Sequence, residues 1–350
     1  MEIQFNIIYT TGTVKHLRLF VFSLLKWSDS AFRLVANACS PQEMRLLREV
    51  CQKSPRLEFL ALPYKRPSPH DKTLSYLQSI ERSDYFCFMD SDMLATGDFM
   101  GEMSPYLSGH AAVFSGAPIW CTREEQVLPT TLPRVRGQFS RTADGVCLGS
   151  SYFAIYDNRV LTQFIQSTGI DFRRYWWREV APQYQGLLAG MGLKKDRFDT
   201  GKLLNLLLAA EDKPIVFVDS QFLQHIGSVS IRGALKASSN PVNLLKSTRW
   251  APAVKLRQWI KRLRGGRASA GADGVTPDAE RAEIHKMRGR MMATAVYFDQ
   301  LFDSLFENKP LPPVPHVDDP AVEERVGSVT AHIVSLYGEF EQQLEPSAAH

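Results

Sequence analysis

The chain has 350 residues, of which 44% are hydrophobic and 22% are charged, with a formal net charge of +4. This composition is typical of a folded globular protein and excludes fibrous and intrinsically disordered classes. Five cysteines lie apart without a C-x-x-C pair, which favours reduced thiols over a disulfide framework or a zinc site.

Strand and helix patterns alternate through the first 92 residues. Short apolar runs predict strands, and apolar residues at helical spacing predict the helices between them. Ser40, Pro41 and Glu43 stand where a helix prefers its N-cap, N1 and N3 residues. This order predicts an α/β fold with a mostly parallel sheet. The predicted strands are 3–9, 32–38, 57–62 and 85–89, and the predicted helices are 16–27, 41–53 and 71–82.

The remainder of the chain predicts more mixed elements. Residues 122–142 are polar and rich in Pro and Arg, which is typical of a long binding loop or lid. We expect an α/β domain over 1–231, a basic segment and linker over 232–276, and a helical C-terminal extension over 277–350. The predicted helices are 99–107, 159–168, 202–210, 277–307 and 321–344, and the predicted strands are 111–115, 146–155 and 214–218.

An apolar run, 85–89, leads directly into Asp90-Ser91-Asp92. Such a run predicts a strand buried on both faces, and ligands in open α/β sheets bind at the carboxyl ends of strands. Two carboxylates there favour a hard divalent cation. Aspartates also cap turns, but the buried strand before them favours the metal site.

Three features in this order resemble glycosyltransferases of the GT-A fold, broadly like family 2. They are the acid pair Asp90-Ser91-Asp92 after the fourth strand, Asp199 before a later helix, and His225 after one more strand. The resemblance covers about residues 1 to 230. It implies a Rossmann-like GT-A catalytic domain that moves a sugar from a nucleoside diphosphate sugar to an acceptor hydroxyl.

The resemblance also implies the metal ligands and the base. Asp90, Asp92 and His225 would hold Mn²⁺ or Mg²⁺, and the histidine favours manganese. Asp199 would remove the proton of the acceptor hydroxyl. The family has paired acids there, whereas this chain has Asp199-Thr200, so inverting and retaining outcomes both stay open. The alternatives are a helix N-cap for Asp199 and an ordinary hydrogen-bonded histidine for His225.

The donor contacts follow from the same resemblance. The turn after the first strand and the end of the second would hold the base, and Lys72 would reach the base or a phosphate. Trp176 and Trp177 favour core or lid packing over stacking on an acceptor sugar. The expected donor-binding residues are Thr10, Thr11, Asn37, Lys72, Asp90, Ser91, Gly149 and Ser150.

Positive charge is concentrated in one segment, because residues 220–272 contain ten Lys or Arg and no Asp or Glu. Within it, 244–267 interleaves basic and apolar residues. Such a helix can lie on an anionic membrane, which would suit a lipid-linked acceptor, or pack on the domain with a solvated basic face. We expect no nucleic-acid binding, because no known motif accompanies the local charge.

We expect neither a signal peptide nor a membrane-spanning helix, since a strand begins near the first residue and no apolar run is long enough. The expected location is cytoplasmic, with peripheral contact on the inner face of the membrane left open. The sequence leaves the oligomeric state, the sugar and the nucleotide undetermined. The acceptor is equally open among a glycan, a lipid-linked sugar and a small molecule.

Other functions remain as alternatives. One is a non-catalytic nucleotide-sugar-binding protein or a membrane-associated scaffold. Another is a phosphatase of the haloacid-dehalogenase type, but that family places its aspartates on the first strand and prefers Thr or Val where Leu94 stands. A nucleotidyltransferase would need a glycine-rich loop after the first strand, where this chain has only Gly12.

Overall fold

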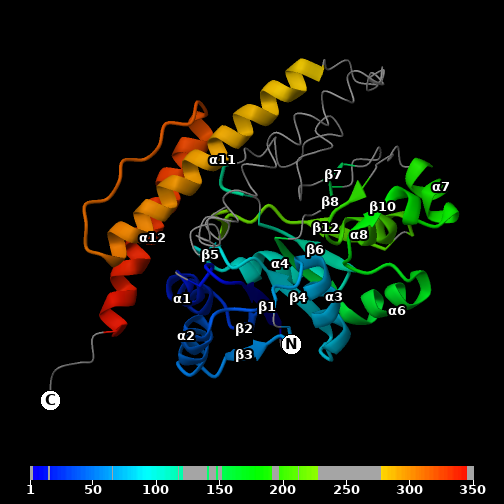
Figure 1. The fold of residues 1–350 in the computed structure, drawn as a ribbon, viewed down its shortest axis with the longest axis horizontal. Helices are drawn as coiled ribbons and strands as arrows, with labels where there is room; N and C mark the ends of the chain where they lie inside the picture. Colours follow the sequence, from blue (N-terminus) through cyan, green and yellow to red (C-terminus); the bar gives the residue numbers. More distant parts are fainter. Residues whose placement is uncertain are drawn as a thin grey trace.

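A seven-stranded sheet forms the centre of the molecule, in the order β12-β6-β9-β4-β1-β2-β3 (Figure 1). All of its strands except β9 run parallel, which confirms the expected α/β class. The computed structural model describes residues 3–14, 16–64, 66–116, 118–120, 140–141, 147–148, 152–190, 197–211, 213–227 and 277–344. The sheet strands are β1 (Gln4–Tyr9), β2 (Ala31–Ala36), β3 (Leu57–Ala61), β4 (Tyr85–Met89), β6 (Ala112–Phe114), β9 (Phe153–Asp157) and β12 (Ile215–Phe217).

Successive side chains of the sheet enter two different cores, as the pleat of a strand requires. Cys87 and Met89 of β4 pack with the helices on one face, and Phe86 and Phe88 pack with the helices on the other. This two-sided burial explains why the strands read as continuous apolar runs. The helices are α1 (Leu17–Trp27), α2 (Pro41–Cys51) and α4 (Phe99–Leu107) on the first face, and α3 (His70–Ile80), α6 (Asn158–Thr168), α7 (Pro182–Gly190) and α8 (Lys202–Ala210) on the second.

The capping box predicted at Ser40 is present. The Glu43 amide donates to Ser40 Oγ at 3.3 Å, and the Ser40 amide donates to a Glu43 carboxylate oxygen at 2.8 Å. The other carboxylate oxygen of Glu43 accepts from the Gly12 amide at 2.6 Å. Glu43 therefore stabilises both the N-terminus of α2 and the turn after β1.

The single strand predicted over 146–155 is wrong, because Tyr152 lies in a turn between two strands. Sequence patterns also missed several short pairings, among them the antiparallel pair β5 and β13. A strand of two or three residues is too short to show a periodicity in the sequence. Whether such a segment forms a strand depends on the segment with which it pairs. The short strands are β5 (Met93–Ala95), β7 (Ser140–Arg141), β8 (Cys147–Leu148), β10 (Tyr175–Trp176), β11 (Arg197–Phe198) and β13 (Leu223–His225).

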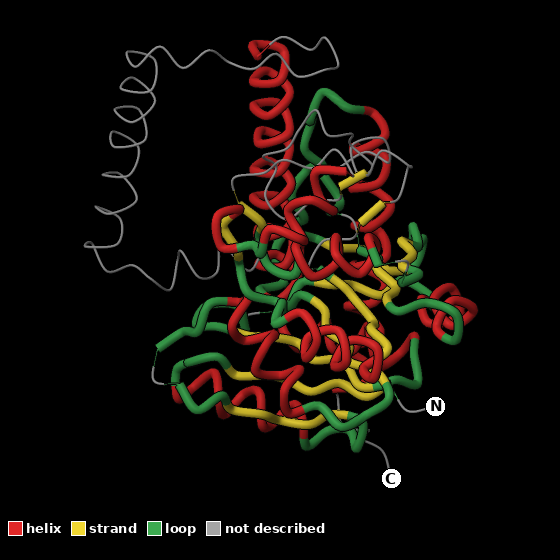
Figure 2. Tube along the Cα trace, turned by 90° about the vertical axis from the view of Figure 1, so that its right-hand side faces the viewer, coloured by secondary structure: helices red, strands yellow, loops and turns green. Residues whose placement is uncertain are grey.

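The predicted C-terminal helices are present as α11 (Pro277–Phe306) and α12 (Pro320–Leu344), which stand to one side of the sheet (Figures 1 and 2). Arg290 pairs with Asp319, Tyr297 bonds Thr330, and Phe306 packs on Tyr337. From the first of these pairs to the third, the residue number rises on both sides of the contact. The helices α11 and α12 therefore run parallel.

A third core joins these two helices to the α/β domain. It contains Phe20 of α1, Leu94 of β5 and Ile226 after β13, together with apolar residues of α11 and α12. His16 adds to this contact, since its ring lies 4.6 Å from that of Phe302. Leu94 and Ile226 stand close in sequence to Asp92 and to His225, so the extension packs directly behind the predicted metal site.

No helix among the described residues is both long and apolar enough to span a membrane. Most of the predicted lid over 122–142 and the basic segment 244–267 lie outside the described residues. The domain boundaries at 231 and 276 therefore stay predictions.

Candidate metal and nucleotide site

Asp90, Asp92 and His225 come together at the carboxyl end of β4. Nε2 of His225 lies 3.2 Å from Asp92 Oδ1 and 3.5 Å from Asp90 Oδ2. One ligand atom from each residue lies within 4.8 Å of the other two. The side chains of His225 and Asp92 are 6% and 3% exposed, whereas that of Asp90 is 28% exposed. Solvent therefore reaches the cluster from the side of Asp90.

The short pair of strands places His225 beside acids far away in sequence. His225 pairs with Met93 in the β5–β13 register, and the Ile226 amide donates to the Asp92 carbonyl at 3.1 Å. On its other side, the His225 carbonyl accepts from the Ile119 amide at 2.8 Å. The backbone of His225 is thus held between β5 and the segment 118–120.

Charge and burial alter the acidities of the cluster. Burial raises the pKa of Asp90 to about 7, the charge of Asp92 adds to the rise, and His225 opposes it. Burial alone would lower the pKa of His225, but Asp92 and Asp90 outweigh it and raise that pKa. The three groups therefore need positive charge among them, which a proton on the imidazole or a cation supplies.

The donor set fits a divalent cation. Two carboxylates and one imidazole are ligands that Mn²⁺ accepts readily, and Mg²⁺ prefers the oxygens. Nε2 of His225 faces the acids, while its buried Nδ1 has no hydrogen-bond partner within the described part of the chain. A second group of the same types, His16 with Asp299 and Asp303, lies between α1 and α11.

Two residues that sequence reasoning did not select surround the cluster. The ring of Tyr152 lies 4.2 Å from that of His225, and its carbonyl accepts from the Asp90 amide at 2.8 Å. Tyr9, at the end of β1, is fully buried, and burial, Cys51 and Asp92 raise its pKa. Nothing in the local pattern of either residue predicts this position, because the pairing of β4 with β1 and with β9 brings them near the acids.

The predicted base-binding residues lie at the same edge of the sheet as the acids, because β1, β2 and β4 are parallel. Thr11 Oγ1 donates to the Ala38 carbonyl at 3.0 Å. The Asn37 amide exchanges two hydrogen bonds of 2.8 Å with the Ser68 backbone. Thr10 begins the turn, and its carbonyl accepts from the Thr13 amide at 3.0 Å. These contacts shape the edge, and nucleotide binding by these residues stays a prediction.

The remaining donor contacts also stay predictions. Lys72 is exposed in the first turn of α3. Ser91 is buried between the two acids. Gly149 and Ser150 lie outside the described residues.

Asp199 does not belong to the cluster formed within the described ranges. Its Oδ1 accepts from the Thr200 amide at 3.0 Å. The N-cap of α8 is Gly201, with φ 67°, so the alternative of Asp199 as the N-cap is wrong. His70 is its neighbour: burial lowers the pKa of His70 to about 4, while the charges of Asp71 and Asp199 oppose that fall. The base role of Asp199 stays a prediction.

The two tryptophans occupy different surroundings. Trp177 stacks on Phe198 with 6.2 Å between ring centroids, which confirms the packing interpretation for this residue. Trp176 is 46% exposed.

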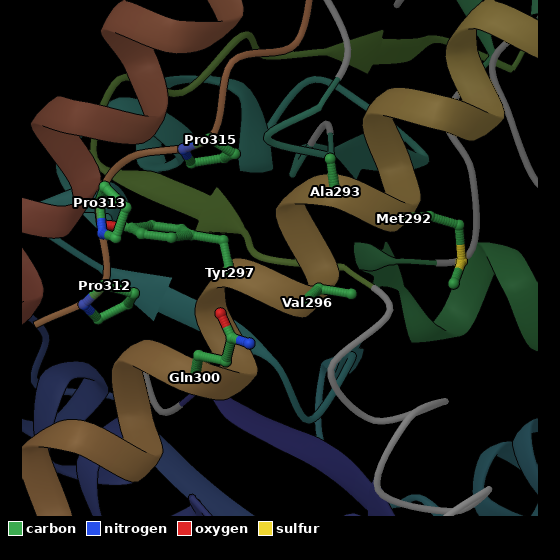
Figure 3. Close-up of a pocket in the computed structure, with 8 residues that line it drawn as sticks. All are labelled: Met292, Ala293, Val296, Tyr297, Gln300, Pro312, Pro313 and Pro315. Carbon is green, nitrogen blue, oxygen red and sulfur yellow. The ribbon is translucent and has the colours of Figure 1, made fainter.

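A cavity of about 390 Å³ lies between α11 and the proline-rich connection to α12. Tyr297 extends from α11 toward Pro313, and Met292 and Val296 lie along the same helix (Figure 3). No residue of the acid–histidine cluster lines it.

Sheet order and site agree with the features expected from the sequence. Four parallel strands lead to the acid pair, and a later histidine lies against it. The fold is of the α/β class, with a mostly parallel central sheet and helices on both of its faces. Asp90-Ser91-Asp92 directly follows β4, at the carboxyl end of that strand.

Comparison with known proteins gives only distant structural similarity. No protein-family model and no curated protein matches the sequence. TarS 1-349 of S. aureus, also solved with UDP, is 11% identical with TM-score 0.41, covering 98% of this chain and 91% of that one. Mouse xyloside xylosyltransferase 1 is 9% identical with TM-score 0.38, covering 63% and 86%.

The glycosyltransferase GlyE of Streptococcus pneumoniae is 10% identical with TM-score 0.35, and the match covers 62% of this chain. The match spans about half of that protein's length, 45% in one structure and 50% in another. Identity and TM-score at these levels say nothing about activity.

Proposed function

We propose that the protein is a glycosyltransferase that moves a sugar from a nucleoside diphosphate sugar to an acceptor hydroxyl. The observation that carries this proposal is the convergence of Asp90, Asp92 and His225 at the carboxyl end of β4. Ligands of open α/β sheets bind at this edge, and the cluster combines buried charge with access from one side.

In this proposal Asp92 and His225 hold a divalent cation, Mn²⁺ or Mg²⁺, and Asp90 completes its protein ligands or faces the ribose. The bound cation would neutralise the charge that develops on the departing diphosphate. Thr10, Thr11, Asn37, Lys72, Ser91, Gly149 and Ser150 would contact the donor, and Asp199 would accept the proton of the acceptor hydroxyl.

The decisive variant is Asp92→Asn, which keeps the shape of the side chain and removes its charge. Calorimetric titration of UDP and GDP, with and without Mn²⁺, should show metal-dependent binding to the wild type. We expect that binding to weaken at least tenfold in the variant, with far-UV circular dichroism unchanged. Equal nucleotide affinity in both proteins would contradict the metal site.

Turnover is tested next, by screening nucleotide sugars for Mn²⁺-dependent hydrolysis, because hydrolysis needs no knowledge of the acceptor. A second candidate is a non-catalytic nucleotide-sugar-binding protein, since the same cluster of Asp90, Asp92 and His225 would hold a nucleoside diphosphate through a cation whether or not transfer follows. Metal-dependent nucleotide binding without hydrolysis or transfer would favour that candidate.

The phosphatase alternative has no support, because the acids follow β4 and not β1.

A cytoplasmic location and membrane contact through 244–267 are further parts of the proposal. Flotation with anionic vesicles, comparing the wild type with a deletion of 244–267, tests this contact.

A further inference from the structure

Arg325 of α12 connects the C-terminal extension to the strands of the site. Its Nε and Nη2 donate to the Gln224 side-chain oxygen at 3.1 and 2.9 Å. Its Nη1 donates to the Pro118 carbonyl at 3.2 Å. A planar guanidinium makes this forked contact, whereas a lysine ammonium would not reproduce it.

Arg325 joins the strand that contains His225 to segment 118–120, one of the two segments that hold His225. Gln224 precedes His225 in β13, and its neighbours on the strand pair with β5 immediately after the acid pair. Pro118 forms a β-bridge with His225, and the next residue, Ile119, donates its amide to the His225 carbonyl. One side chain therefore links the residue before a predicted metal ligand to the segment that lies against that ligand.

The extension holds Arg325 in place through its own packing. Val322, Val326 and Val329 follow helical spacing on α12 and are buried in the third core. Arg325 lies on the border of this apolar face and is half-buried. Ordering a long side chain costs conformational entropy, and a helix anchored on either side of it reduces that cost.

We propose that Arg325 is a positioning residue that holds the Gln224–His225 strand against segment 118–120, so that Nε2 of His225 faces Asp90 and Asp92. The C-terminal extension is then part of the metal site. This inference rests on the metal site of the proposed function. It adds to that site Arg325, which lies 100 positions after His225 in the chain.

Charge and positioning predict opposite effects, which makes the proposal testable. The guanidinium lies within electrostatic reach of His225, so its charge alone would repel a bound cation. Removing Arg325 would then tighten metal binding. If the contact positions His225, removing Arg325 weakens metal binding, as the loss of residues that orient metal ligands usually does.

The experiment titrates the full-length protein with Mn²⁺ alone and follows free Mn²⁺ by electron paramagnetic resonance. Because His16, Asp299 and Asp303 form a second group of metal-binding types, the relevant signal is the part that Asp92→Asn abolishes. We expect Arg325→Ala to weaken that part by about 10-fold or more, and Arg325→Lys to recover only a fraction of it. Glu324→Ala, at the exposed neighbouring position on α12, is the matched control and should bind like the wild type.

A second variant tests the contact from its other side, and it does not depend on the folding of Arg325→Ala. Gln224→Met keeps the length of the side chain and removes the acceptor, so we expect a similar loss of Mn²⁺ affinity. The double variant should lose clearly less than the sum of the two single losses, because both changes break the contact between Arg325 and Gln224. The bond of Arg325 to the Pro118 carbonyl and that of Gln224 to the Gln221 carbonyl are each lost in one single variant only.

Unchanged or tighter Mn²⁺ binding in a folded Gln224→Met or Arg325→Ala protein would overturn the positioning role. If the wild type shows no Mn²⁺ binding that depends on Asp92, the proposed function itself fails, and the two failures are distinct.

Discussion

At the scale of single residues, the charge on three side chains dominates the site. Asp92 and His225 are buried, and Asp90 keeps one side open to solvent. An unpaired buried carboxylate is costly, so this group of residues has a physical need for a cation or a shared proton. Asp199 differs, because its carboxylate accepts a hydrogen bond from the adjacent backbone and lies by His70.

Asp199→Asn separates binding from transfer. If Asp199 accepts the acceptor proton, the amide variant loses transfer by about 100-fold or more, while Mn²⁺-dependent nucleotide binding stays within about twofold of the wild type. Rates of transfer and calorimetric nucleotide affinity are the two measurements. Near-normal turnover would leave Asp199 with only its contact to the Thr200 amide.

The acidities of the cluster predict how stability depends on pH without metal. The folded pKa values of Asp90 and His225 both lie above their ordinary values. Each group therefore binds a proton more tightly in the folded state, so its contribution to stability is lost as pH rises. For Asp90 this loss extends from about pH 4 to about 7.

We expect the metal-free protein to lose free energy of unfolding between pH 5 and pH 8, as measured by urea denaturation with a chelator present. Added Mn²⁺ should offset the loss at pH 8, because it replaces the proton. Asp90→Asn is the control and should flatten the profile. A steeper profile in that variant would contradict the assignment.

At the scale of elements, the shortest strands have the largest influence on the site. β5 and β13 pair antiparallel and bring His225 to the acid pair. The chain then turns at Gly227, which has φ 67°. A Cβ at Gly227 would lie 3.0 Å from Trp120 Nε1, on the segment that contacts His225.

Gly227→Ala should therefore destabilise the protein by about 1–2 kcal/mol, because a non-glycine residue is strained at positive φ. Chemical denaturation measures this change. Gly109→Ala is a suitable control, since a Cβ there meets no atom within 4 Å. A loss of equal size in both variants would show that the turn geometry at Gly227 is unimportant.

At the scale of the whole molecule, the parallel helices α11 and α12 complete the α/β domain. Their apolar faces share a core with α1 and β5, so the extension is packed where the metal site is built. Phe302 is central to this contact, because it is fully buried and its ring packs on His16 and Phe20.

Phe302→Ala should lower the free energy of unfolding by about 3–5 kcal/mol through the cavity that it leaves. Phe306→Ala, on the same helix but 40% exposed, should cost clearly less. Denaturant unfolding gives both values, and hydrogen exchange should show the loss of protection first in α11 and α12. Equal costs for the two variants would contradict the buried core.

Several features were predictable from sequence because they depend on neighbours along the chain. The continuous apolar run 85–89 gave β4 and its terminal acids, and Ser40 with Glu43 gave the start of α2. Helical spacing also predicted α11 and α12 to within a residue at each end. Local patterns failed at Tyr152, where a turn interrupts the predicted strand, and at Gly201, which caps α8 in place of Asp199.

The sequence by itself determined the α/β class and the acid pair at a strand end, because burial on two faces and capping leave local patterns. Only the tertiary structure decided that His225 lies against Asp92, that Asp199 lies apart from them, and that Arg325 of the extension joins the strands around His225. These contacts join segments more than 100 residues apart, and their energy comes from pairing and packing that no local window of sequence records.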